Sequence, residues 1–422
     1  MKIGLITQWY PPEHGSAALP GTIAAALDLA GNEVEVVTGF PNYPHGELQE
    51  GWRQSWGFHE RRSGATVYRT PVYISHDENP VRRMINYVSF ALSASLTALR
   101  RLRSVDVVWV HGTPVLPALP AMALRSLLGI PFVLHIQDLW PDTVLASGML
   151  PRRLDRLVRK PLEWFCNRAY RSASVIGIIT PGMRRALVSR GVPSEKIVDI
   201  PNWADEEVFR PVPRRQDVLR ELGLPTESFI AMYAGAIGEV QGLQTLVRAA
   251  ALLRDEPDIH VAIVGDGIAR TSLKKLADTL DLTNVTFVPA QPLDQMSQVL
   301  TSADVQIVCL KDLPLYRITL PSKIQATLAT GTPLIVSAGG DAGRVVVDAA
   351  AGRSCPAGDA DALAVAMRDL ATAGPAHLAS LGSAGRRYYE SQFSQSTGVE
   401  RMLRALARAH SDRKTREDKE KS

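Results

Sequence analysis

Short apolar runs rich in β-branched residues alternate along this chain with longer segments of helical period. An apolar run of four to eight residues bounded by turn residues indicates a buried strand, and helical segments between such runs indicate βαβ units around parallel sheets. The alternation occurs twice, once in each half of the chain. The predicted strands cover residues 2–7, 33–38, 105–111, 131–135 and 175–180 in the first half, and 229–233, 260–264, 285–288, 305–309 and 333–337 in the second.

A polar, proline-rich stretch separates the two halves at residues 200–215. Because segments of this composition join domains, we place a boundary near residue 205. The predicted fold class is α/β, with two Rossmann-like, doubly wound domains. Ligands of such domains bind beyond the carboxyl ends of the strands, so we expect the site in a cleft between the domains. The predicted organisation is an N-terminal domain (1–205), a C-terminal domain (206–383), a closing helical segment (384–410) that crosses back to the first domain, and a disordered charged tail (411–422).

The composition is that of a globular protein. The chain has 422 residues, 45% hydrophobic and 21% charged, which excludes a disordered or collagen-like chain. Its three cysteines, Cys166, Cys309 and Cys355, lack the spacing of a zinc site or a disulfide framework, and this predicts a reducing cytoplasm. The apolar run after Met1 stops at Gln8, too early for a secretory signal.

Arginines cluster in the first half, although the formal net charge of the chain is only +4. A basic face predicts an anionic partner, and a phospholipid surface or a phosphorylated acceptor fits better than nucleic acid. The alternative is the solvated face of ordinary helices. Residues 81–104 form an apolar helical segment with arginines at both ends. Its apolar interior is shorter than the about 20 residues that span a bilayer, so it either lies in the membrane interface or packs on the N-terminal sheet. In the interfacial arrangement, the side chains expected to enter the acyl region are Met84, Tyr87, Val88, Leu92 and Leu99.

Glycine-containing turns follow several predicted strands. Gly15 and Ser16 follow the first strand, where backbone N–H groups and a helix dipole would hold a phosphate. A glycine needed only for the turn is the alternative. In the second half, the loop at 234–243 and the loop at 264–267 are rich in glycine but lack the GxGxxG spacing of dinucleotide binders.

A third loop of the second half, at 320–325, places Ser322 and Lys323 at the start of an apolar helix. A lysine, a hydroxyl group and the N–H groups of a helix start are the groups that bind a diphosphate. Taken alone, this segment would be an ordinary helix start.

Taken in order, these motifs resemble glycosyltransferase family 4, a retaining family with the GT-B fold, over about residues 1–410. The residues that carry the resemblance are Pro11-Pro12 with Gly15, Pro201-Asn202, Tyr233-Ala234-Gly235, Gly242-Leu243, Val264-Gly265-Asp266-Gly267, Ala303-Asp304, Gly331-Thr332-Pro333 and Phe393-Ser394. Finer motifs look like the bacterial branch that builds O-antigen, capsule and colanic-acid repeat units and includes L-fucosamine transferases. These motifs are residues 8–13, 39–44, 138–142 and 321–323.

The resemblance implies transfer of a hexosyl or N-acetylhexosaminyl group, with retained configuration, from a nucleoside diphosphate sugar. The implied acceptor is a polyprenyl-diphosphate-linked or other glycan of cell-surface polysaccharide or glycolipid biosynthesis, met at the inner face of the cell membrane. It implies no metal ion or other cofactor and no covalent intermediate, with the donor phosphate taking the acceptor proton. The residues it places at the donor are Gly15, Ser16, Gly235, Gly265, Gly267, Gly339 and Gly340, and those at the acceptor are Asn42 and Trp140.

The chain departs from the family where charged residues are usual. The family's paired glutamates would fall at Ile318 and Ala326, and the arginine and lysine that neutralise the diphosphate would fall at Ala236 and Gln241. We therefore expect Lys323, assisted by Ser322, to supply the missing charge. Glu239, Gln241 and Gln325 are the remaining donor candidates, with Gln325 or Glu239 at the ribose.

The family histidine near the reacting sugar would fall at Gln137. His135 lies two residues earlier on the same side of an extended strand; it either substitutes for that histidine or is a histidine at the edge of the core. We expect Asp138 to contact the acceptor or the reacting sugar, with capping of the helix after Pro141 as the alternative. The sequence Asp359-Ala360-Asp361 is expected to be a helix N-cap rather than a metal-binding DxD motif.

Two other functions remain open. One is a GT-B nucleotide-sugar 2-epimerase, and the other is a non-catalytic nucleotide-sugar-binding relative, which the missing glutamates would permit. A nicotinamide-dependent oxidoreductase is disfavoured, because no predicted strand is followed by GxGxxG with an acidic residue about twenty positions further on.

Overall fold

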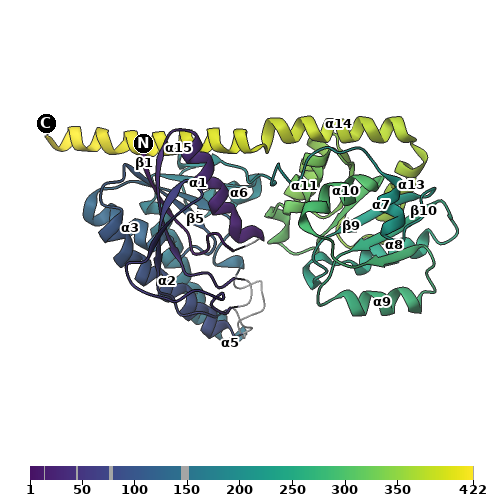
Figure 1. Ribbon diagram of the computed structural model, residues 1–422, viewed down its shortest axis with the longest axis horizontal. Helices are drawn as coiled ribbons and strands as arrows, with labels where there is room; N and C mark the ends of the chain where they lie inside the picture. Colours follow the sequence, from purple (N-terminus) through teal and green to yellow (C-terminus); the bar gives the residue numbers. More distant parts are fainter. Residues whose placement is uncertain (14, 44–45, 76–78, 144–151, 422) are drawn as a thin grey trace. The chain divides into compact units, whose positions relative to one another are not determined.

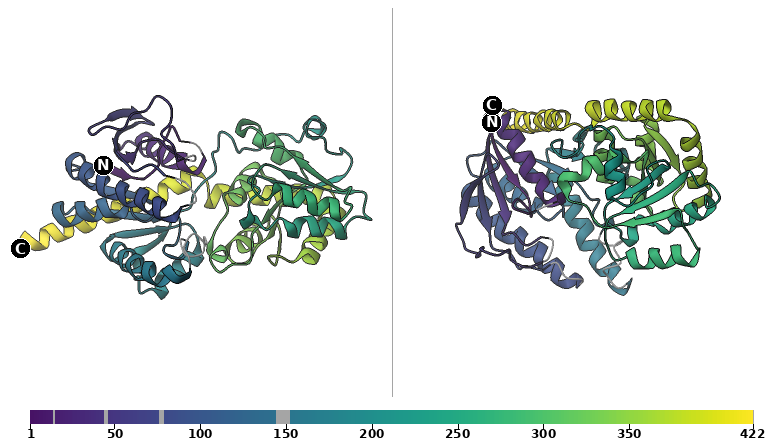
Figure 2. Two further views of the ribbon diagram at one scale, coloured as in Figure 1. Left: turned by 90° about the horizontal axis from the view of Figure 1, so that it is seen from below. Right: turned by 45° about the vertical axis from the view of Figure 1, so that its right-hand side comes forward.

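The computed structural model describes residues 1–421 except 14, 44–45, 76–78 and 144–151. The chain divides into two compact units: Met1–Ile200 with Val399–Ser422, and Pro201–Gly398. In each unit, helices cover both faces of a central sheet (Figures 1 and 2). No helix of the described residues combines the length and the apolarity needed to cross a bilayer.

The first unit contains an eight-stranded sheet of order β3-β4-β2-β1-β5-β6-β7-β8. Neighbouring strands are parallel except for the antiparallel pair β3 and β4 at one edge. The strands are β1 (Lys2–Ile6), β2 (Glu33–Gly39), β3 (His59–Arg62), β4 (Ala65–Thr70), β5 (Val107–Gly112), β6 (Phe132–Ile136), β7 (Val175–Ile178) and β8 (Ile197–Asp199). The helices are η1 (Gly15–Ala18), α1 (Leu19–Leu29), α2 (Pro80–Arg101), α3 (Ala118–Leu128), α5 (Arg152–Ser172), α6 (Pro181–Ser189) and η2 (Ser194–Lys196).

The second unit contains a six-stranded parallel sheet of order β11-β10-β9-β12-β13-β14, the order of a doubly wound nucleotide-binding fold. The strands are β9 (Phe229–Ala234), β10 (Ile259–Val264), β11 (Val285–Val288), β12 (Val305–Cys309), β13 (Leu334–Ser337) and β14 (Gly352–Cys355). The helices are α7 (Gln216–Glu221), η3 (Glu239–Gln241), α8 (Gln244–Leu252), α9 (Arg270–Thr279), η4 (Leu293–Gln295), α10 (Met296–Ser302), η5 (Tyr316–Ile318), α11 (Ser322–Thr330), α12 (Asp341–Asp348), α13 (Ala360–Thr372) and α14 (Pro375–Gln392).

The central strand β9 shows why such strands read as continuous apolar runs. Ala231 and Tyr233 pack into a core cluster on one face of the sheet, while Ile230 and Met232 pack into another cluster on the opposite face. A strand with both faces buried has no polar alternation. All ten predicted strands are present. The sequence did not predict β3, β8 and β14, which have only four, three and four residues, or β4, whose apolar pattern is interrupted by Thr66, Arg69 and Thr70.

The C-terminal region consists of α14 and α15 (Gln395–Lys421), with Phe393 between them. The division between the units falls inside α15, between Gly398 and Val399. Near this point the backbone at Gly398 lies close to Trp203, since an added Cβ would lie 2.4 Å from the indole ring. Helix α15 extends into the tail for which the composition predicted disorder, and this tail is rich in Lys, Arg and Glu, which are good helix formers.

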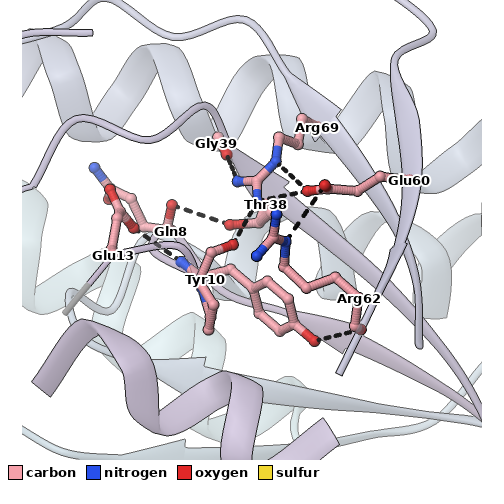
Figure 3. A network of polar contacts seen from close by, with 9 residues as sticks. Gln8, Tyr10, Glu13, Thr38, Gly39, Glu60, Arg62 and Arg69 are labelled. Atoms are coloured by element: carbon pink, nitrogen blue, oxygen red, sulfur yellow. Dashed lines mark hydrogen bonds and ion pairs between the residues drawn. The ribbon is translucent and has the colours of Figure 1, made fainter. Parts of the chain in front are cut away.

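Arg69 of β4 lies at the centre of a buried polar network under the carboxyl edge of the first sheet (Figure 3). Its guanidinium group donates to the carbonyl of Gly39 at 3.0 Å and to that of Pro11 at 2.5 Å, and it pairs with the Glu60 carboxylate at 2.7 Å. Gly39 ends β2 and Pro11 follows β1. One buried cation therefore ties together the loops that follow two neighbouring strands.

Glu13 joins the same two loops from the other side. Its carboxylate accepts hydrogen bonds from the backbone N–H groups of Tyr10 (2.9 Å), Asn42 (2.8 Å) and Tyr43 (2.9 Å). Burial raises the pKa of Glu13, and the three backbone donors oppose that rise. The edge that carries the predicted acceptor residues is thus held by buried charges.

Replacing Arg69 tests this network. In Arg69→Met, Glu60 loses its buried partner and the two carbonyls lose their donor, so we expect the free energy of unfolding to fall by about 3–5 kcal/mol. Arg62→Met is the matched control, because Arg62 also pairs with Glu60 but is partly exposed, and we expect a loss below about 1 kcal/mol. Urea denaturation measures both. Equal losses in the two variants would contradict the role given to Arg69.

Candidate active site

The strand order of the second unit places a ligand site at the carboxyl edge of its sheet. Strands β9 and β12 are neighbours, and the chain leaves them in opposite directions, toward β10 and toward β13. The helices that follow, α8 and α11, pack into core clusters on opposite faces of the sheet. Ligands of doubly wound sheets bind at such a reversal. The loops that follow β9, β10, β12 and β13 all begin at this edge.

The loops after β9 and β10 lie backbone against backbone. Ile237 donates a hydrogen bond to the carbonyl of Asp266 at 2.8 Å. An added Cβ would lie 2.0 Å from the Gly235 oxygen if built on Gly265, and 2.4 Å from the Ile237 oxygen if built on Gly267. Both glycines also have a positive φ, +138° and +150°. The structure therefore brings together three of the predicted donor residues, Gly235, Gly265 and Gly267, and requires glycine at the last two.

Lys323, the second residue of α11, reaches this pair of loops. Its Nζ donates to the Tyr233 hydroxyl and lies 3.7 Å from the centre of that ring, and Tyr233 in turn donates to the carbonyl of Ala236 at 2.5 Å. An added Cβ on Gly235 would lie 2.8 Å from the Lys323 Nζ. Burial lowers the pKa of Lys323 to about 7. The ammonium group thus lies beside Gly235, which the family resemblance places at the donor.

The start of α11 adds further donors for an anion. Pro321 occupies the N-cap position and has no polar side chain to cap the helix. Ser322 is exposed in the first turn, so its hydroxyl is accessible from solvent. The first N–H groups of a helix and its dipole attract an anion, so the diphosphate role expected for Ser322 and Lys323 stays a prediction that this geometry permits.

Two other predicted donor residues make contacts within the fold. The Gln241 Oε1 accepts a hydrogen bond from the Gly238 backbone N–H at 3.0 Å and so stabilises the turn of η3. The Gln325 side chain is buried, and its amide donates to the Asn202 carbonyl at 2.9 Å. These contacts give Gln241 and Gln325 structural roles, and they argue against Gln325 as the ribose contact.

Lys311 is a cation at this edge that the sequence analysis missed. Its backbone N–H donates to the Val240 carbonyl at 3.0 Å, which joins the loops after β12 and β9. Its Nζ pairs with Glu239, another predicted donor residue, at 3.1 Å. The signal in the sequence was a basic residue two positions after the predicted strand at 305–309. The structure thus places a second lysine at the edge of the sheet where the strand order reverses.

The loop after β13 carries Gly339 and Gly340. Gly340 has φ +74°, and an added Cβ would lie 1.8 Å from the Arg317 carbonyl oxygen. The side chain of Arg317 lies over Gly339 and pairs with Asp312 at 2.8 Å. The predicted glycines therefore accommodate η5 and its exposed arginine, which the sequence analysis also missed.

In the first unit, His135 lies at the end of β6 and is fully buried. Its Nε2 lies 3.0 Å from the Ile200 carbonyl, and its Nδ1 lies 3.1 Å from the Gln137 amide nitrogen. Burial lowers the pKa of His135 to about 4, so the ring is neutral at pH 7, with Nε2–H donating and Nδ1 accepting. Of the two roles that the sequence left open for His135, these contacts favour the structural one.

Asp138 differs from its neighbours on this edge. Burial raises its pKa, and among the described residues its half-buried carboxylate makes no hydrogen bond or ion pair. The capping contact considered as an alternative is therefore not seen there. Trp140, in contrast, has a buried side chain that packs edge-on against Tyr87 with ring centres 5.8 Å apart. Within the described part of the chain, no contact of Asp138 competes with a ligand at this edge, while the Trp140 side chain is buried beneath it.

The other predicted residues of the first unit lie in the loops after β1 and β2. Asn42 is buried, and its amide donates to the Phe40 carbonyl at 2.7 Å within its own loop. Gly15 and Ser16 open η1, which leads into α1; the Ser16 side chain lies outside what the structure describes. The helical start at Gly15 is as predicted. The Asn42 side chain, in contrast, stabilises its own loop and is not free to contact an acceptor substrate.

Aromatic side chains from four segments meet at this edge, which the sequence analysis did not foresee. The Trp9 ring centre lies 5.4 Å from that of Tyr43 and 6.5 Å from that of Tyr87, which in turn packs on Trp140. Trp9, Tyr43 and Tyr87 are only half-buried. Aromatic faces present a large apolar surface with a polar rim, and these four residues, the aromatic cluster, form a wall beside Asp138's loop.

The expected N-cap at Asp359 is confirmed. Its carboxylate accepts a hydrogen bond from the Ala362 N–H at 2.9 Å at the start of α13. Within the part of the chain that the structure describes, no three His, Cys, Asp or Glu side chains are grouped as a metal site would require.

Comparison with known proteins identifies the family. Two family profiles match, a glycosyl transferase 4-like domain over residues 15–203 and glycosyl transferases group 1 over residues 214–388. The chain is 33% identical over 344 residues to the putative colanic acid biosynthesis glycosyl transferase WcaI of Escherichia coli, covering 80% of this chain and 83% of that protein. The chain belongs to glycosyltransferase family 4. The probable glycosyltransferase WbjE of Pseudomonas aeruginosa is 26% identical over 317 residues, 75% of this chain and 77% of that protein.

A solved structure agrees on the fold of this family 4 glycosyltransferase. The HepE protein of Anabaena, determined with UDP and glucose, superposes with a TM-score of 0.68 at 16% identity, covering 96% of this chain and 99% of that one. At this level of identity the likeness concerns the fold alone. The prediction of a GT-B fold built from two Rossmann-like domains is confirmed.

Lys323 generates a direct test of the donor edge. Removing a charged hydrogen bond to an anionic ligand costs about 1.5–3 kcal/mol, so Lys323→Met should weaken the binding of nucleoside diphosphates at pH 6.5 by about tenfold or more. Isothermal titration calorimetry measures the affinity. Lys311→Met is the matched control, since Lys311 is already paired with Glu239, and a smaller effect is expected. A larger effect at Lys311 would transfer the role to that residue.

The same titrations repeated across pH isolate the contribution of the Lys323 charge. With a pKa near 7, Lys323 is charged at lower pH and neutral at higher pH. Affinity should therefore fall as pH rises, by up to about tenfold per unit above 7, and this slope should be missing in Lys323→Met. The groups beside Nζ do not titrate there, because burial raises the pKa of Cys309 to about 12 and that of Tyr233 further still. A slope shared by wild type and variant would remove Lys323 from the site.

Proposed function

We propose that this glycosyltransferase moves a sugar from a nucleoside diphosphate donor, bound by the second unit, to a glycan acceptor bound by the first. The observation that carries the proposal is Lys323. A partly buried ammonium group at a helix start, against two glycine loops and at the reversal of the strand order, is the arrangement that receives a diphosphate. Ser322 and the N–H groups of α11 supply the remaining donors.

The donor proposed first is a UDP-sugar. HepE, which shares the fold, was determined with UDP, with UDP and glucose, and with UDP-glucose. We propose a hexosyl or N-acetylhexosaminyl group as the sugar. Because Gln325 is bound to the Asn202 carbonyl, Glu239 remains the proposed ribose contact, released from Lys311 when the nucleotide binds.

We propose that transfer retains the anomeric configuration. The bond between the anomeric carbon and the diphosphate oxygen breaks, the acceptor oxygen attaches to that carbon on the same face, and the acceptor proton passes to the departing phosphate. Lys323 and the α11 N–H groups stabilise the charge that develops on the diphosphate, and Asp138 orients the acceptor or the reacting sugar. We propose no metal ion, other cofactor or covalent intermediate for this reaction.

The proposed acceptor is a polyprenyl-diphosphate-linked glycan of cell-surface polysaccharide biosynthesis. WcaI is named for colanic acid biosynthesis and covers most of this chain. An acceptor with a lipid anchor must be met at a bilayer, and nucleoside diphosphate sugars are cytoplasmic metabolites, so we propose a peripheral location at the inner face of the cell membrane. The aromatic cluster offers the acceptor sugars an apolar face to stack against.

The alternatives named from the sequence are not favoured. WcaI and WbjE, which are similar over most of the chain, are described as glycosyltransferases, not as epimerases. The replaced glutamates at Ile318 and Ala326 still leave room for a protein that binds a donor without transferring it. Transfer itself therefore has to be measured.

A donor and acceptor screen tests the function. Purified protein is offered UDP-, GDP- and dTDP-sugars, and a donor that binds the native state should raise its melting temperature. Radiolabelled forms of the stabilising donors are then incubated with extracted polyprenyl-diphosphate-linked oligosaccharides. We expect label in the lipid fraction that depends on a UDP-sugar. Donor turnover without an acceptor would favour the epimerase, and binding without turnover would favour the non-catalytic relative.

Asp138→Asn separates a role in transfer from a role in folding. If the carboxylate contacts acceptor or sugar, turnover should fall by about a hundredfold, while nucleotide affinity and melting temperature remain close to wild type. Thr143→Val in the same loop is a control for local packing, because among the described residues the Thr143 hydroxyl donates to the Leu139 carbonyl. A large fall in melting temperature with activity per folded molecule preserved would assign Asp138 to the fold.

A further inference from the structure

Helix α2 of the first unit has an exposed face that is almost purely apolar. Between Arg82 and Arg100, every residue of α2 that is exposed is apolar, and Val81 extends the same line at its start. The line, which we name the α2 stripe, consists of Val81, Ile85, Val88, Leu92 and Leu96, with side chains 40–60% exposed. The spacing of four, three, four and four residues places them on one side of the helix. A surface helix of a globular protein normally carries polar residues there.

The opposite side of α2 already supplies the packing that the fold needs. Phe90, Ala94, Ala98 and Leu102 are completely buried, and the helix contacts α3 and the strands β2 and β4. The α2 stripe is therefore not the core face of a displaced helix. This corrects the residue set expected from the sequence: Val88 and Leu92 are exposed, whereas Met84, Tyr87 and Leu99 are half-buried.

Polar side chains along α2 make the contrast sharper. The Ser89 hydroxyl donates to the Asn86 carbonyl at 2.9 Å, and the Ser95 hydroxyl to the Ala91 carbonyl at 2.7 Å. Thr97 donates to the Thr70 hydroxyl at 3.2 Å. These hydroxyl groups donate their hydrogen bonds within the protein, so they add no polar group to the exposed α2 stripe.

The charges of α2 specify what kind of surface covers the stripe. The helix has no Asp or Glu, while Arg82 and Arg83 lie in its first turn and Arg100 and Arg101 in its last. Apolar residues flanked by cations at both ends complement an anionic phospholipid surface, with acyl chains against the stripe and headgroups against the arginines. A protein partner would need acidic groups at both ends of an apolar groove, and neutral lipid would not use the arginines.

We propose that the α2 stripe is the surface by which this enzyme lies on an anionic bilayer, with α2 parallel to the membrane plane. The proposal deepens the proposed function, since it rests on a lipid-linked acceptor as the reason for membrane contact. It also accounts for Tyr87, which projects from the same helix into the aromatic cluster at 6.5 Å from Trp9 and 5.8 Å from Trp140. A bilayer held against the stripe thus lies beside the place where the acceptor sugars stack, and the lipid tail need not leave the membrane.

Vesicle flotation tests the stripe. Ile85→Ser, Leu92→Ser and Leu96→Ser are combined in one variant, and Arg100→Glu with Arg101→Glu in a second. Wild type should float with phosphatidylcholine vesicles that contain phosphatidylglycerol and detach in high salt. Each variant should bind these vesicles at least about tenfold more weakly than wild type. The matched control combines Leu252→Ser, Val365→Ser and Arg254→Glu, which changes exposed apolar and basic residues of the second unit. This control should float like wild type.

Insertion of the stripe is measured directly with a label. Cys166, Cys309 and Cys355 are all buried, so an environment-sensitive fluorophore can be attached selectively to Val88→Cys on α2 or to Val365→Cys on α13. On addition of the anionic vesicles, emission should shift to the blue at position 88 and stay unchanged at position 365. No shift at position 88, or equal shifts at both positions, would overturn the proposal.

Two further outcomes would also overturn it. Equal flotation on pure phosphatidylcholine would remove the role of the arginines. Unchanged vesicle binding by the stripe variant, together with loss of a dimer in analytical ultracentrifugation, would assign the stripe to a second copy of the chain. None of these measurements uses a sugar donor or acceptor, so they can fail while glycosyl transfer is established, and the transfer assay can fail while vesicle binding holds.

Discussion

Direct backbone contact between the loops after β9 and β10 is the constraint from which the donor edge follows. The contact needs Gly265 and Gly267, because a Cβ at either position would overlap a carbonyl oxygen of the neighbouring loop. With the loops this close, the space beside Gly235 is open to the Lys323 side chain, and Tyr233 holds the ammonium group there. A larger residue at Gly235 would displace the lysine. Because Gly235, Gly265 and Gly267 carry no side chain, the Lys323 ammonium group can lie at the position on which donor binding is proposed to depend.

Both ligand edges use charged groups that have been partly removed from water, but they use them differently. At the first edge, Arg69 is paired with Glu60 and with two backbone carbonyls, and Glu13 accepts three backbone N–H groups, so both charges brace the loops. Lys323 and Asp138 are partly removed from water, which lowers the pKa of Lys323 and raises that of Asp138, and among the described residues neither forms an ion pair. A buried charge with few partners gains more interaction energy from a charged or polar ligand than a charge that is already paired.

Helix α2 shows one element serving three requirements at once. Phe90, Ala94 and Ala98 pack on the sheet, Tyr87 contributes to the aromatic cluster, and the α2 stripe is left for an external partner. An α-helix can do this because its side chains point outward in all directions, so residues one or two apart face different surroundings. The proposed membrane contact and the proposed acceptor site would therefore share a single helix.

The sequence by itself determined the elements that depend on near neighbours: the apolar strands of both sheets, the glycine turns, the N-cap at Asp359 and the place of Lys323 at a helix start. Hydrophobic period, turn chemistry and capping act over a few residues, and so they can be read from the chain. Only the tertiary structure decided which polar groups remained available. Gln325 reaches Asn202 and His135 reaches Ile200 across long separations in sequence, which withdrew two predicted ligand contacts. The exposure of the α2 stripe was decided in the same way, because an apolar helix has several faces and packing against distant strands selects the one that is buried.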